Sequence, residues 1–119
     1  MVRINKNNLE FTKGDACVLR VELVDETNTP VDLTTCTGLL TVKEYLNDST
    51  FAEKISLSFF AHPDENKPLG VVFFKFLPSH TNPLKIKKYY YDIQIVRGTD
   101  VYTVREGDIS LTKEVKFNV

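Results

Sequence analysis

Side-chain character alternates strictly between residues 89 and 96, and this alternation constrains the fold more than any other feature of the chain. Apolar and aromatic side chains share one face, and more polar ones share the other: Tyr89, Tyr91, Ile93 and Ile95 against Tyr90, Asp92, Gln94 and Val96. A period of two residues is typical of a β-strand with one buried face. The segment therefore predicts a half-buried strand that directs two tyrosine rings into the core.

Segments of the same kind recur at intervals of about ten residues, and clusters of Gly, Pro, Asn and Asp separate them. The predicted strands cover residues 9–11, 16–24, 38–45, 53–60, 70–77, 89–96, 101–105 and 109–119, with a turn at 106–108 before the last one. No long stretch has a helical period, and no linker or internal repeat divides the chain. We therefore predict one all-β domain over residues 1–119, a two-sheet antiparallel sandwich.

The composition is that of a globular protein, since 42% of the 119 residues are hydrophobic and 26% are charged. A net charge of −1 gives no support to binding of nucleic acid or of an anionic membrane. No apolar run approaches the roughly 18 residues of a membrane span, and residues 1–8 lack the apolar core of a secretory signal. We therefore expect synthesis in the cytoplasm, with Cys17 and Cys36 as free thiols.

Residues that could carry catalytic or metal chemistry are sparse. The two histidines, His62 and His80, lie in predicted loops beside prolines, with no triad or HExxH motif around them. Acidic pairs at 25–26 and 64–65 lack the spacing of a calcium loop. We therefore predict no enzymatic activity, no catalytic residues, no bound metal and no cofactor.

A basic cluster of Lys85, Lys87 and Lys88 precedes the three tyrosines and has the superficial composition of a nucleic-acid platform. The alternation places Tyr89 and Tyr91 in the core, which leaves Tyr90 alone on the exposed face. We therefore predict no nucleic-acid binding.

Three short motifs occur in an order that resembles a family of phage domains. Phe11-Thr12-Lys13-Gly14-Asp15 precedes a strand, Asn28-Thr29-Pro30-Val31-Asp32-Leu33-Thr34 follows it, and Leu77 through Thr81 to Leu84 leads into Tyr89-Tyr90-Tyr91-Asp92-Ile93-Gln94. In this order they resemble the immunoglobulin-like N-terminal domain of phage baseplate upper proteins and related small virion proteins of the tail and baseplate. The likeness runs from Phe11 to Val115, and it departs from the family at Lys87-Lys88 and at Asn28-Thr29, where the family has glycine.

The resemblance implies an immunoglobulin-like sandwich of about seven to nine strands. It also implies a non-enzymatic structural protein of the virion, a tail, baseplate, connector or decoration module. Such a module would dock to other virion proteins and form a homo-oligomer, after synthesis in the host cytoplasm. The alternative is a carbohydrate- or host-receptor-binding sandwich, in which exposed tyrosines such as Tyr90 and Tyr102 would stack on a glycan.

Residues 71–77 are apolar on both faces, and Lys75 is the one interruption. A strand of this kind is either covered on both sides within its own sandwich or packed against a second subunit, and the sequence leaves both possibilities open. The candidate interface residues are Val71, Phe73, Lys75, Tyr90 and Tyr102.

Overall fold

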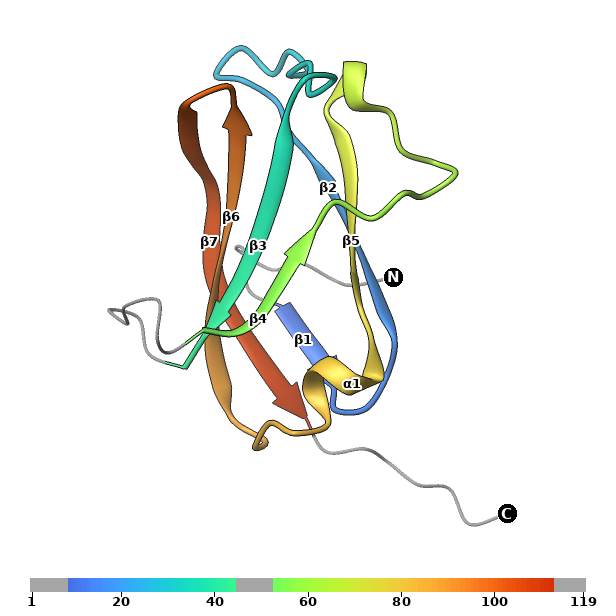
Figure 1. The fold of residues 1–119 in the computed structure, drawn as a ribbon, viewed down its shortest axis with the longest axis vertical. Coiled ribbons are helices and arrows are strands. Elements are labelled where there is room, and N and C mark those ends of the chain that lie inside the picture. The colour runs from blue at the N-terminus through green and yellow to red at the C-terminus, as the bar shows by residue number, and fades with distance from the viewer. Residues whose placement is uncertain (1–8, 45–52, 113–119) are drawn as a thin grey trace.

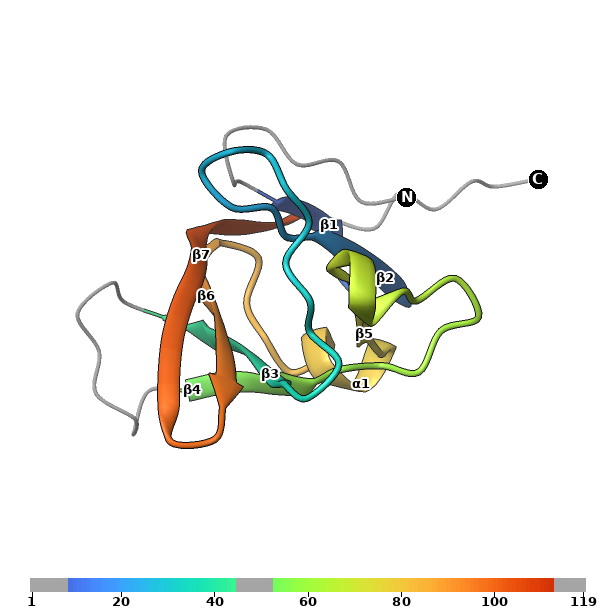
Figure 2. The ribbon, with the colours of Figure 1, turned by 90° about the horizontal axis from the view of Figure 1, so that it is seen from above.

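The alternating tyrosine segment forms β6 (Lys88–Arg97) in the computed structural model, which describes residues 9–44 and 53–112. The described residues form two β-sheets packed face to face (Figures 1 and 2). The larger sheet has the order β1-β7-β6-β3-β4, and the smaller sheet pairs β2 with β5. These seven strands confirm the prediction of an all-β sandwich.

The strands have the following bounds: β1 Leu9–Thr12, β2 Cys17–Glu22, β3 Thr37–Lys43, β4 Glu53–Ser58, β5 Val71–Phe76, β6 Lys88–Arg97 and β7 Asp100–Thr112. A 3-10 turn, η2 (Lys67–Leu69), precedes β5, and a single helical turn, α1 (Pro78–Thr81), follows it. The second strand lies beside the fifth in one sheet, and the third, sixth and seventh strands are neighbours in the other. This is the strand order of an immunoglobulin-like sandwich.

The core lies between the two sheets and follows the predicted alternation. Tyr89, Tyr91, Ile93 and Ile95 of β6 are all buried, whereas the intervening residues remain partly exposed. Facing them, Phe74 and Phe76 of β5 are almost completely buried. Each such side chain contributes about 1.5–3 kcal/mol on leaving water, so this inter-sheet layer dominates the stability of the fold.

Two details of the topology differ from the prediction. The turn expected at residues 106–108 is wrong, because β7 continues through them and pairs with Tyr90, Tyr91 and Asp92 of β6. Cross-strand pairing along the whole of β6 overrides the turn preference of Gly107 and its acidic neighbours. The outermost pair is also parallel, since β1 runs alongside the last four residues of β7. Residues 113–119 of the predicted last strand lie outside the described residues.

Two of the motif segments meet at one end of the sandwich. The Gly14 amide, in a left-handed turn, donates a hydrogen bond to Oγ1 of Thr81, and Thr81 is 1% exposed. The motif residues therefore have a structural role, which is to fasten the β1–β2 turn to α1.

Candidate docking groove

An apolar groove opens at the end of the sandwich where β6 turns into β7. Its volume is about 580 Å³. The β6–β7 hairpin forms one wall and the connection from β2 to β3 forms the other, with Ile95, Tyr102 and Val104 facing Leu23, Val31 and Leu33. In Figure 1 these two elements are the orange hairpin and the light blue loop at the top of the molecule.

The groove exists because the smaller sheet is narrow. β2 ends at Glu22, and the chain then leaves the sheet as a long connection before it enters β3 at Thr37. Loop residues, and not a third strand, therefore face the inner side of the hairpin tip. Val24, Tyr102 and Val104 remain 43%, 52% and 37% exposed as a result.

The loop wall is held in place by hydrogen bonds of two aspartates. Oδ1 of Asp25 accepts hydrogen bonds from the amides of Thr27 and Thr29, at 2.9 and 3.0 Å. Oδ1 of Asp32 accepts one from the Thr34 amide at 2.9 Å. The hydroxyls of Thr27 and Thr34 also donate to Asp25 and Asp32, and these hydroxyl bonds, followed by the amide bonds, hold the pKa of each carboxyl below its ordinary value. The wall is thus a defined surface built from turn chemistry.

Arg97 joins the two walls. Its Nη2 donates a hydrogen bond of 2.7 Å to the carbonyl oxygen of Asp32, and its Nε lies 3.4 Å from Sγ of Cys36. The guanidinium therefore ties the end of β6 to the loop, and both Arg97 and Cys36 line the groove. Both cysteines are free thiols, and Cys36 is the more buried of the two.

An open strand edge borders the groove. β7 pairs with β6 along nearly its whole length, whereas β1 covers its other edge only from Ile109 to Thr112. Within the described residues, no strand pairs with that second edge at residues 101–106, which we call the open edge. A row of backbone N–H and C=O groups on such an edge can accept an added strand.

The structure places three of the candidate interface residues under a loop of the same chain. Phe73 is 4% exposed, and the ring of His62 stacks on it with centroids 4.0 Å apart. The Phe60 amide donates a 2.7 Å hydrogen bond to the Phe73 carbonyl, and Nζ of Lys75 lies 5.1 Å from the Phe60 ring centroid. Val71 is 8% exposed. A single copy of the chain thus covers both faces of this strand.

The two tyrosines among the candidates are separate from that site and from each other. Tyr90 is half-buried on the outer face of β6, and Tyr102 lies in the groove. Among the Phe and Tyr side chains that the structure describes, Tyr102 alone is exposed. A cluster of exposed rings, which would favour sugar binding, is therefore not present in this part of the chain.

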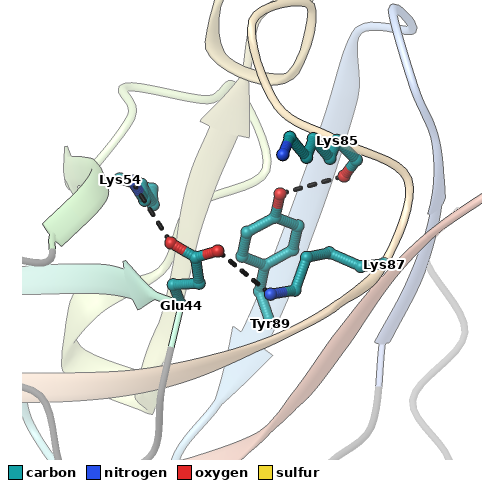
Figure 3. A network of polar contacts seen from close by, with 5 residues as sticks. All are labelled: Glu44, Lys54, Lys85, Lys87 and Tyr89. Carbon is teal, nitrogen blue, oxygen red and sulfur yellow. Dashed lines mark hydrogen bonds and ion pairs between the residues drawn. The ribbon is translucent and has the colours of Figure 1, made fainter.

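The basic cluster lies at the opposite end of the sandwich, and two of its three lysines are paired with carboxylates; Figure 3 shows the pair of Lys87. Nζ of Lys87 lies 3.0 Å from a Glu44 carboxylate oxygen, whose other oxygen is 3.5 Å from Nζ of Lys54. The bond from Lys87 lowers the pKa of Glu44. Nζ of Lys88 lies 3.8 Å from a carboxylate oxygen of Asp108. These carboxylates weaken the positive potential that a nucleic-acid platform requires.

The histidines act as local structural groups. Nδ1 of His80 accepts a hydrogen bond from the Leu77 amide, and Nδ1 of His62 accepts one from the Asp64 amide. Among residues 9–44 and 53–112, no group of three His, Cys, Asp or Glu side chains is placed to hold a metal ion. No described helix is long and apolar enough to cross a membrane.

Of the β7 residues at the groove and the open edge, sequence reasoning singled out Tyr102 and missed Val101 and Val104. The missed signal was the run Val101-Tyr102-Thr103-Val104, which is β-prone on both faces in the same way as residues 71–77. Comparison with protein-family models and with curated proteins gives no match to this chain.

Proposed function

We propose that this protein is a non-enzymatic structural module of a phage virion, a component of the tail, baseplate or connector that docks to other virion proteins. The observation that carries the docking role is the open edge of β7 next to an apolar groove. Long exposed edges promote pairing with other chains, and natural sandwiches usually blunt or cover them.

The assignment to a virion is supported by the motif resemblance together with the strand order. The three motifs occur in the order of the phage family, and the strand order is that of an immunoglobulin-like sandwich. Because this fold hosts many functions, the specific role rests on the motifs and on the docking surface.

Quantitative mass spectrometry of purified particles tests this proposal. Virions from a culture that expresses the protein should contain it at a fixed number of copies per particle, and cross-links should join residues of the groove or open edge to a neighbouring protein. A protein that is expressed but absent from intact particles would contradict the virion role.

A further inference from the structure

We infer that the groove and open edge of one copy bind residues 113–119 of a second copy, which add to β7 as a strand. This inference rests on the proposed docking function and names the partner. The protein would then assemble with itself, through a receiving surface at one end of the sandwich and a ligand segment at the other.

The receiving surface combines three features. The open edge, residues 101–106, has no partner strand among the described residues and so offers its backbone groups for pairing. Tyr102 and Val104 line the groove on its inner side, and Val101 is 57% exposed. Residues 100–108 also carry three carboxylates and one guanidinium, a net charge of −2. A suitable partner is therefore an extended, alternating apolar segment with positive charge.

Residues 113–119, Lys-Glu-Val-Lys-Phe-Asn-Val, have this composition. Val115, Phe117 and Val119 alternate with Glu114, Lys116 and Asn118, so an extended chain would present three apolar side chains on one face. Two lysines and one glutamate give the segment a net charge of +1. The charge of the segment is opposite to the net charge of residues 100–108, the stretch that contains the open edge, whereas two such stretches brought together would have the same sign.

Geometry excludes binding of the segment to the groove of its own chain. Figure 1 shows β7 running from the groove end to the opposite end of the sandwich, where its described part stops at Thr112. Ten residues separate Tyr102 from Thr112, or about 33 Å along a strand. Seven residues span at most about 25 Å, so the segment cannot turn back and cover Tyr102. The contact must therefore join two copies.

A surface at one end and its ligand at the other give a head-to-tail contact. Such heterologous contacts generate closed rings or open filaments, according to the rotation between successive copies. Repeated copies of one module in a virion ring or tube could be joined in this way.

The test uses two full-length variants, each of which blocks one half of the contact. Tyr102→Lys places a charge in the groove, and Phe117→Glu places one in the segment. Light-scattering mass from micromolar to near-millimolar concentration should rise for the wild type and remain monomeric for each variant. Leu69→Lys is the control, because Leu69 is 53% exposed outside the groove lining, and it should assemble like the wild type. Unfolding curves confirm that every variant is folded.

Mixing the two variants gives the decisive result. The intact segment of the Tyr102→Lys chain should enter the intact groove of the Phe117→Glu chain, and the mixture should stop at a heterodimer. A mixture that stays monomeric while the wild type assembles overturns the inference in favour of a symmetric contact. A strictly monomeric wild type also overturns the inference, and the open edge would then be left for another partner, such as a different virion protein. The composition of the particle still tests the proposed function separately.

Discussion

At the scale of single residues, the two core tyrosines of β6 show what alternation does and does not determine. Both rings are buried on the same face, and the hydroxyl of Tyr89 donates a hydrogen bond of 2.9 Å to the Lys85 carbonyl, the bond expected of a corner tyrosine. Burial raises the pKa of Tyr91, and Arg105 beside it opposes this rise. The shared face was predictable, but the partner of the Tyr89 hydroxyl depends on the path of residues 82–87.

Tyr89→Phe should lower the free energy of unfolding by about 1 kcal/mol, because it removes a half-buried hydrogen bond and leaves the Lys85 carbonyl unpaired. Urea unfolding of the variant measures this change. Tyr90→Phe is the matched control, since no hydrogen bond of the Tyr90 hydroxyl is seen in the described part of the chain and little change is expected. Equal effects of the two substitutions would contradict the assignment of Tyr89 as the corner tyrosine.

Asp25 and Asp32 should titrate below the ordinary aspartate pKa of about 3.9. Because folding lowers the pKa, the stabilisation of the groove wall is fully present above the unfolded value and is lost as the pH falls through the folded value. NMR titration of the two carboxyl groups and of the Thr27 and Thr34 amides measures this. Ordinary pKa values at Asp25 and Asp32 would show that the wall is not held as described.

At the scale of elements, most strands could be predicted because each has its own alternating pattern and the core follows from the resulting faces. The groove could not be predicted, because it depends on the width of the smaller sheet and on where the connection after Glu22 crosses the hairpin. Both are long-range features with no local signal. The two-faced strand β5 shows the same limit, since only the structure reveals His62 and Phe60 over its outer face.

Phe73→Ala should destabilise the fold by about 3–5 kcal/mol, as expected for a buried phenylalanine, and should leave assembly of the folded protein unchanged. Thermal unfolding and light-scattering mass measure the two effects separately. Leu69→Ala, at an exposed site on η2, should change stability by no more than about 0.5 kcal/mol. Loss of assembly in a folded Phe73→Ala protein would instead make the outer face of β5 part of the interface.

At the scale of the whole molecule, the two ends of the sandwich differ in character. One end carries the apolar groove and the open edge, whereas the other carries the paired lysines, the tyrosine corner and the fastening of Gly14 to Thr81. This polarity favours assembly in one direction, as the proposed docking role requires.

Amide hydrogen exchange over residues 101–106, in the free protein and in the assembled particle, tests the central claim most directly. An added strand would bond the amides that the open edge exposes, so their exchange should slow several-fold on assembly while the β5 amides stay unchanged. Unchanged exchange at 101–106, with new protection elsewhere, would show that the protein docks through a different surface.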